Sequence, residues 1–153
     1  MLDPAALRAR LDSVRERIAD AARRVGRDPA SIRLVAISKT FPIEDVRAAV
    51  GAGQRDFGEN KIQEALPKID GAGDLAATWH FVGHLQSNKA RKAAERFDVI
   101  HSIDSADLAL RLDAAAAEAN RAVKLLSQVD LAGVATKHGA AEESLPAILS
   151  AAS

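Results

Sequence analysis

The sequence predicts an α/β protein with about five parallel strands and their helices, arranged as an incomplete (β/α)8 TIM-type barrel. Strand-like and helix-like segments alternate without a hairpin signal, which indicates parallel strands joined by right-handed crossovers. The predicted strands also begin at an even interval of roughly 23 residues, as the repeats of such a barrel do. An open doubly wound sheet is the competing architecture, and it would place the first strand in the middle of the sheet.

The first predicted element is an amphipathic helix over residues 3–25, because apolar side chains recur every three or four residues until Gly26. An almost uninterrupted apolar run at 32–38 follows. Such a run is typical of a strand in a parallel sheet that is covered on both faces. The same reasoning predicts further strands at 55–58, 78–83, 98–103 and 122–129.

Helices are predicted after each strand, at 44–50, 60–69, 87–96, 105–119 and 142–151. Glycines at 51 and 53 end the first of these, and Pro67 is expected to stop or kink the second. Short polar side chains accept hydrogen bonds from free backbone amides at helix starts. The expected residues at these starts are Asn60, Ser87 or Asn88, and Asp104 or Ser105.

The composition predicts one soluble globular domain over residues 1–153, with 48% hydrophobic residues and 21 basic residues balanced by 21 acidic ones. The arginines of the first helix alternate with acidic residues, which favours a solvated face over a nucleic-acid surface. The absence of cysteine excludes disulfides, thiolate catalysis and cysteine-ligated metals. No apolar stretch approaches the ~20 residues of a membrane span, so we expect no membrane partner and a cytoplasmic location.

Lys39 closes the first apolar run and therefore stands at the carboxyl end of a strand. Ligands bind at that edge in parallel α/β architectures. No other lysine follows such a run, so we expect Lys39 to be the most desolvated lysine, with its pKa lowered toward the neutral amine that forms Schiff bases. The alternative is an ordinary lysine whose stem packs and whose charged head lies in solvent.

Polar side chains follow the second and third predicted strands at the same edge. Glu59 and Asn60 follow the second strand, and Gln86 and Asn88 follow the third. Together they would surround one pocket mouth, as a small polar ligand needs. His80 and His84 are four residues apart but straddle a strand end and a loop, so no metal site is predicted.

Three segments at this edge carry a family resemblance: LVAISKT at 34–40, FGENKIQE at 57–64 and WHFVGHLQSNK at 79–89. With the later segments 101–104, 128–130 and 137–139, they resemble the consecutive motifs of the pyridoxal phosphate homeostasis proteins (YggS/PROSC type). The resemblance implies a barrel of the alanine racemase N-terminal type. It also implies pyridoxal 5′-phosphate held as a Schiff base on Lys39, with Asn60 beside the cofactor ring. His80 and Gly83 complete the expected cofactor-binding residues.

The function that the resemblance implies is cofactor homeostasis, with a small-molecule cofactor as partner, no catalytic turnover and a monomeric full-length family. A racemase needs two acid–base groups, one on each face of its substrate, and no obvious second group occurs at the pocket. Two alternatives stay open. One is a racemase-like enzyme with His80 or His84 as the second base, and the other is a scaffold that binds no cofactor.

Members of the resembled family continue with further strands, whose Gly-Met-Ser-x-Asp-type segment and final Gly-rich loop cradle the cofactor phosphate. Neither segment occurs in this sequence. We therefore expect the chain to be C-terminally truncated, with the edge of its first strand exposed.

Overall fold

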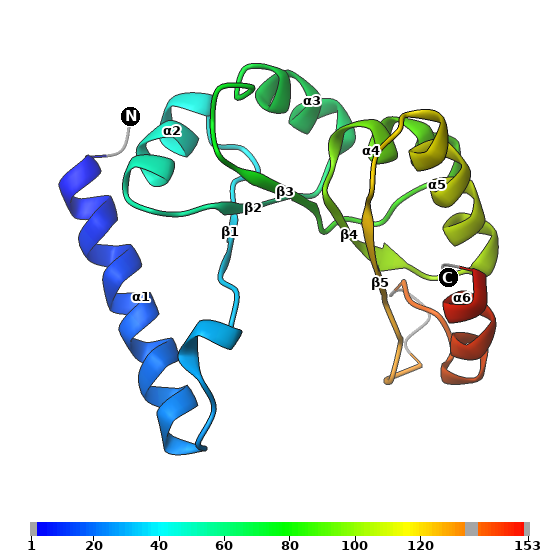
Figure 1. The fold of residues 1–153 in the computed structure, drawn as a ribbon, viewed down its shortest axis with the longest axis horizontal. Coiled ribbons are helices and arrows are strands. Elements are labelled where there is room, and N and C mark those ends of the chain that lie inside the picture. Colours follow the sequence, from blue (N-terminus) through cyan, green and yellow to red (C-terminus); the bar gives the residue numbers. More distant parts are fainter. Residues whose placement is uncertain (1–2, 134–137, 152–153) are drawn as a thin grey trace.

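The computed structural model describes residues 3–133 and 138–151, so Lys137 lies outside the described residues. Five parallel strands form one sheet in the order β1-β2-β3-β4-β5. Because the order in the sheet is the order in the sequence, the barrel-type arrangement is confirmed and the doubly wound alternative is wrong. The sheet is not closed, and β1 and β5 form its two edges (Figure 1). The strands are β1 (Val35–Ile37), β2 (Asp56–Glu59), β3 (Thr78–Phe81), β4 (Val99–Ile103) and β5 (Lys124–Ser127).

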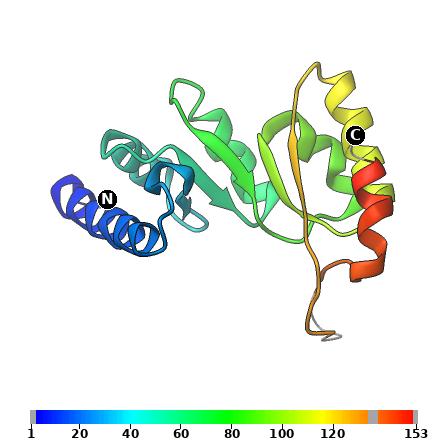
Figure 2. The same ribbon diagram turned by 60° about the horizontal axis from the view of Figure 1, so that its bottom comes forward.

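Helices α2 to α5 lie along one side of the curved sheet, with α1 beyond β1 and α6 beside α5 at the far end (Figures 1 and 2). The six helices are α1 (Pro4–Arg24), α2 (Ile43–Gly51), α3 (Ile62–Asp70), α4 (Ala90–Arg96), α5 (Ala106–Glu118) and α6 (Leu145–Ala151). Short 3₁₀ turns precede β1, α4 and α6 at η1 (Pro29–Ser31), η2 (Ser87–Lys89) and η3 (Glu142–Ser144).

The hydrophobic core lies between the sheet and these helices. The rings of Phe57 and Trp79 lie 5.8 Å apart across β2 and β3, and the Phe81 ring meets Phe97 at 5.2 Å in an edge-on contact. Successive side chains of a strand alternate between the two faces, so residues 57 and 59 of β2 share the helix-facing side. α4 packs mainly against α5, and its small side chains Ala93 and Ala94 are fully buried.

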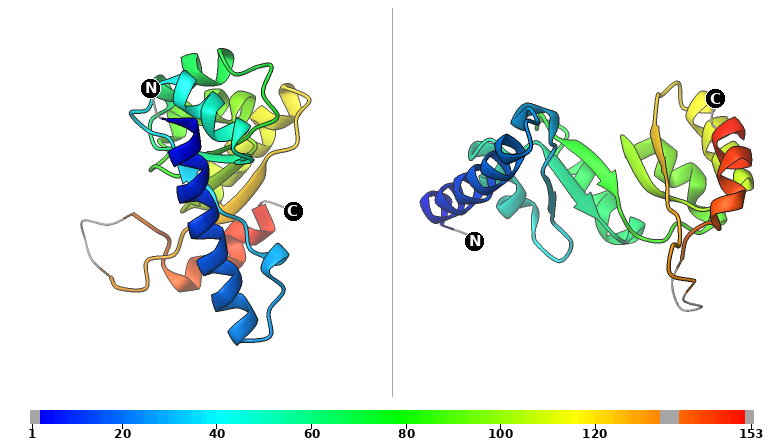
Figure 3. Two further views of the ribbon diagram at one scale, coloured as in Figure 1. Left: turned by 90° about the vertical axis from the view of Figure 1, so that its left-hand side faces the viewer. Right: turned by 90° about the horizontal axis from the view of Figure 1, so that it is seen from below.

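The opposite face of the sheet, here called the inner face, is not covered by a helix within residues 3–133 and 138–151 (Figures 1 and 3). Ile37 of β1 and Leu126 of β5 lie on it and are 49% and 42% exposed. The first strand is therefore apolar on both faces but packed on only one. The expectation of a strand covered on both faces is wrong, because that expectation depends on what lies across the sheet.

Several predicted element ends also need correction. α3 ends at Asp70, one residue past the predicted end, so Pro67 does not stop it. Its N-cap is Lys61 rather than Asn60, without a side-chain cap bond. Neither Ser87 nor Asn88 caps α4, because the 3₁₀ turn η2 occupies that position. Ser105 is the cap of α5, where its Oγ accepts a hydrogen bond from the Leu108 amide at 3.3 Å.

Candidate functional site

Lys39 lies at the carboxyl edge of the sheet, two residues beyond the last residue of β1. The Ser38 amide still donates to the Gly58 carbonyl at 2.9 Å, and the Phe41 amide then donates back to the Ser38 carbonyl at 3.1 Å. Thr40 takes a left-handed conformation with φ of 68° in this turn. The position of Lys39 is as expected, but its side chain is exposed. Its expected desolvation is wrong, because the inner face beside it is open.

The strand register defines what lies beneath Lys39. Ile37 pairs with Gly58, and Gly58 pairs with His80, so these three residues form one row across the inner face. Two residues further along the chain in each case, just past the strand ends, lie Lys39, Asn60 and Val82. Gly58 has no side chain, and a Cβ there would lie 2.6 Å from Ile37 Cδ1. The row therefore forms a shallow floor, apolar at Ile37, below the lysine.

Gly83 brings two loops of this edge together. A Cβ at Gly83 would overlap the carbonyl oxygen of Asn60 and would lie 3.0 Å from its Cα. The Val82 amide also donates to the Glu59 carbonyl at 2.8 Å. Only a glycine permits this approach of the β3–α4 loop to the β2–α3 loop. Asn60 is half-buried beside Gly83, and it is not used to cap α3.

His80 lies one row below the rim and is 2% exposed. Its Nε2 is 2.9 Å from Asp56 Oδ1, and its Nδ1 is 2.8 Å from His101 Nε2. Arg33 in turn donates to Asp56 at 3.0 Å. Burial, and secondarily the charge of His80, lower the pKa of His101 from its usual value. His80 is thus enclosed in a network across the strands, and neither of its ring nitrogens is free to serve as a base.

Glu59 lies on the helix side of the sheet rather than at the expected pocket mouth, and its side chain is fully buried. The Lys68 Nζ donates to Glu59 Oε1 at 2.5 Å and to the Ser38 carbonyl at 2.7 Å. Ser38 Oγ donates to the same Glu59 oxygen at 2.7 Å. Lys68 was not among the predicted site residues, although it follows the buried Ala65 by three residues, as Ala65 follows the buried Ile62, which places all three on one side of α3.

The remaining polar residues of this edge gather near β5. The His84 ring stacks on His138 with centroids 3.8 Å apart, and His84 Nδ1 lies 3.7 Å from Asp104 Oδ2. An open pocket of about 510 Å³ lies beside them, lined also by Gln128 and Asp130. Gln86 and Asn88 are exposed. Over the described ranges, no three His, Asp or Glu side chains are grouped so that they could hold a metal ion.

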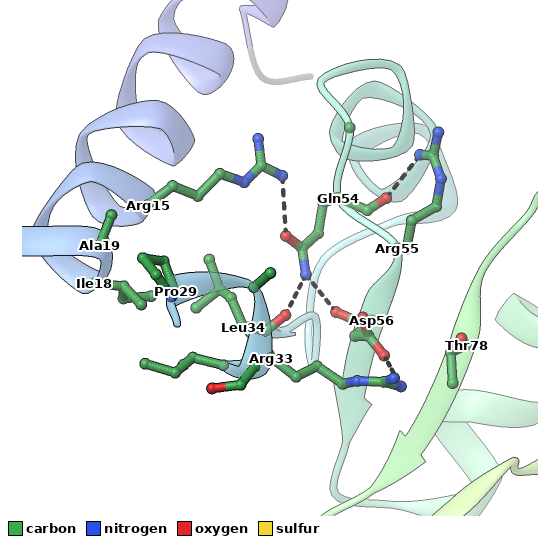
Figure 4. Close-up of a pocket in the computed structure, with 14 residues that line it drawn as sticks. Arg15, Ile18, Ala19, Pro29, Arg33, Leu34, Gln54, Arg55, Asp56 and Thr78 are labelled. Carbon is green, nitrogen blue, oxygen red and sulfur yellow. Dashed lines mark hydrogen bonds and ion pairs between the residues drawn. The ribbon is translucent and has the colours of Figure 1, made fainter. Parts of the chain in front are cut away.

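A wider pocket of about 730 Å³ lies at the opposite, amino edge of the sheet, between α1 and the first two strands (Figure 4). Gln54 Nε2 donates there to the carbonyls of Leu34 and Asp56 at 2.7 and 2.8 Å, and its Oε1 accepts from Arg15 at 3.4 Å. These polar groups bond one another and tie α1 to the strands. Ligand sites of parallel α/β proteins lie at the carboxyl edge, so we assign this pocket a structural role.

Comparison with known proteins gives a consistent result. Residues 9–153 match the family model described as "Alanine racemase, N-terminal domain". The "Pyridoxal phosphate homeostasis protein" of Pseudomonas aeruginosa is 46% identical over 138 residues, which are 90% of this chain and 60% of that protein. The protein of the same name from Synechocystis is 49% identical over 118 residues, 76% of this chain and 54% of that protein.

A solved structure is similar as well. PipY of Synechococcus elongatus, with PLP (pyridoxal 5′-phosphate) bound, has a TM-score of 0.72 and 48% identity, covering 87% of this chain and 62% of that one. The chain thus spans 54–60% of the length of the two curated relatives above. In the part of the chain that the structure describes, no helix has the length and apolar character needed to cross a membrane.

Proposed function

Since the chain belongs to the alanine racemase N-terminal domain family, we propose that it binds PLP as a Schiff base on Lys39 and serves in homeostasis of this cofactor. The observation that carries the proposal is the exposed position of Lys39 at the carboxyl edge, next to the row that contains Ile37 and Gly58. The names of the two relatives and the PLP bound to PipY support it.

The residues of this edge fit the cofactor. PLP supplies an aldehyde, which condenses with an unprotonated lysine amine to form a carbon–nitrogen double bond with release of water. Lys39 offers an amine that solvent and ligand can reach. The partly exposed Ile37 and Val82 provide apolar surface for a planar ring, and the Asn60 amide provides hydrogen-bonding groups beside it. Gly83 allows the β3–α4 loop to lie against the β2–α3 loop. His80 completes the row of Ile37 and Gly58 that forms the floor.

Binding without turnover is the better supported reading of this site. A racemase needs a second acid–base group opposite the lysine. His80 is buried with both ring nitrogens engaged, and His84 is stacked on His138 beside Asp104. As further parts of the proposal, the chain is a single domain and cytoplasmic, and full-length members of the family are monomeric. Its partner is a small molecule rather than a nucleic acid, in keeping with its equal numbers of acidic and basic residues.

The test is a titration of the chain with PLP, followed by the yellow imine absorbance, for the wild type and Lys39→Ala. The imine band should appear in the wild type and be lost in Lys39→Ala, while Lys61→Ala should keep it. After borohydride reduction, peptide mapping should find the cofactor on Lys39 rather than on Lys61, Lys68, Lys89 or Lys137. Cofactor spread over many lysines would contradict the assignment. Conversion of an added L-amino acid to its D-form would favour the racemase-like alternative.

A further inference from the structure

We infer that Lys68 and Glu59 are positioning residues for Lys39, which they orient by clamping Ser38 from the helix side of the sheet. The inference rests on the proposed function, because it concerns how the chain presents the amine of Lys39. Neither residue reaches the inner face where the cofactor would lie. They act through the backbone of the residue that precedes the lysine.

The burial of this ion pair sets it apart. The Glu59 and Lys68 side chains are 0% and 9% exposed. In nine further pairs of a lysine or arginine with a carboxylate, at least one side chain is exposed by 39% or more. Removing two charges from water is costly, and well-packed apolar residues often serve stability as well or better. Stability alone is therefore a poor explanation for a buried pair at this position.

The pair converges on Ser38 from two directions. Lys68 Nζ donates to the Ser38 carbonyl at 2.7 Å, and Glu59 Oε1 accepts from Ser38 Oγ at 2.7 Å. The Ser38 amide is held separately by the Gly58 carbonyl at 2.9 Å. The amide, carbonyl and hydroxyl of Ser38 thus all have partners, and the ion pair binds two of the three.

This arrangement leaves the amine of Lys39 accessible while fixing its backbone. Ser38 faces the helices, where its hydroxyl donates to Glu59, whereas Lys39 lies in the turn that follows and is exposed. The Ser38 carbonyl that Lys68 binds also accepts a hydrogen bond from the Phe41 amide. This hydrogen bond closes the turn that contains Lys39. Lys39 itself is exposed, so little other packing sets its direction.

The test replaces the pair by apolar residues in the double variant Glu59→Leu/Lys68→Met, which keeps packing and removes the clamp. In the ligand-free chain, hydrogen exchange of the Ser38 and Phe41 amides should accelerate, while the urea midpoint stays close to that of the wild type. PLP affinity should fall on the order of tenfold, because a reacting group is held less closely in place. The pH at which the imine absorbance titrates should shift as well, which loss of packing alone would not cause.

The matched control is the double variant Arg47→Met/Asp74→Leu, which removes an exposed ion pair that joins α2 to the loop after α3. It should leave PLP affinity, the imine titration and the exchange of both amides unchanged. The single variant Ser38→Ala keeps the carbonyl contact and loses the hydroxyl, so its effect should be smaller and in the same direction.

A wild-type chain without an imine band would overturn the proposed function and this inference with it. A wild-type chain that forms the imine on Lys39, together with a double variant unchanged in affinity, imine titration and exchange, would overturn the inference alone. If the double variant does not fold, Ser38→Ala decides, and an unchanged affinity and exchange rate in that variant would reject the clamp.

Discussion

Two lysines approach the carboxyl end of β1 from opposite faces of the sheet. Lys39 is exposed beside the open inner face, whereas the amine of Lys68 is buried and donates to Glu59 and to the Ser38 carbonyl. An amine that forms a Schiff base must be free to meet its carbonyl, so the buried lysine is the poorer nucleophile despite its shelter from water. Selectivity between these lysines therefore follows from access rather than from desolvation.

The pH dependence of stability should report the network at His101. Burial and the neighbouring His80 lower the pKa of His101 below its usual value of 6.5 in the folded chain. The unfolded state takes up a proton at this site below about pH 6.5, whereas the folded state resists it, so the free energy of unfolding should fall as pH drops through this range. The decrease should level off once the pH is below the folded-state pKa.

Urea denaturation of the wild type and His101→Gln between pH 7.5 and 5 measures this contribution. The wild type should lose stability more steeply than the variant as the pH falls. Asp56 contacts His80, and Arg33 donates to Asp56. Neither of these two residues is substituted in the comparison. Parallel pH profiles of the two proteins would show that His101 contributes no such term. The exposed His138→Gln serves as the control and should behave as the wild type.

The order and direction of the strands could be predicted from the sequence because they depend on local alternation and on the handedness of crossovers. The ends of helices and strands could not be predicted in this way, since they depend on the elements that pack beside them. The apolar run at 32–38 yields a strand of only Val35–Ile37, which pairs on one side alone. Likewise, Lys39 was located by the run that it follows, but its exposure depends on what lies across the inner face. Glu59 was assigned to the wrong face of the sheet. Its neighbour Gly58 has no side chain, so the sequence shows no apolar–polar alternation there that would place Glu59 on the helix side.

Pro67 lies inside α3 although proline is unfavourable in the interior of a helix. The helix continues for three residues beyond this proline, which cannot donate a hydrogen bond to the carbonyl four residues earlier. Pro67→Ala restores that donor and should raise the free energy of unfolding by about 1–2 kcal/mol, after allowing for the more flexible unfolded chain. Urea denaturation measures the change. Pro4→Ala at the first position of α1 is the control and should give no gain, because that amide has no partner within the helix. A destabilised Pro67→Ala would show that the proline ring makes a packing contribution larger than the restored bond.

The molecule as described is an arch with helices outside and an open inner face (Figure 1). β1 and β5 are both edge strands, and their inner-face side chains Ile37 and Leu126 are half-exposed. The Pseudomonas aeruginosa relative is matched over only 60% of its length. The open face would leave the proposed Schiff base on Lys39 accessible to water, which is the reactant that reverses its formation.

Extending the chain should therefore strengthen cofactor binding. In a chimera, the C-terminal part of the Pseudomonas aeruginosa relative would follow residue 153. From the family motifs that this sequence lacks, we expect that part to cover the inner face and to add groups for the cofactor phosphate. Charge-assisted hydrogen bonds contribute about 1.5–3 kcal/mol each, so two of them would tighten PLP binding by roughly two to four orders of magnitude. Titrations of PLP and of pyridoxal into both chains, followed by imine absorbance, measure the effect. PLP should be strongly preferred over pyridoxal by the chimera and little preferred by the 153-residue chain, and Lys39→Ala should abolish the imine in both. A 153-residue chain that already prefers PLP strongly would show that its own residues hold the phosphate.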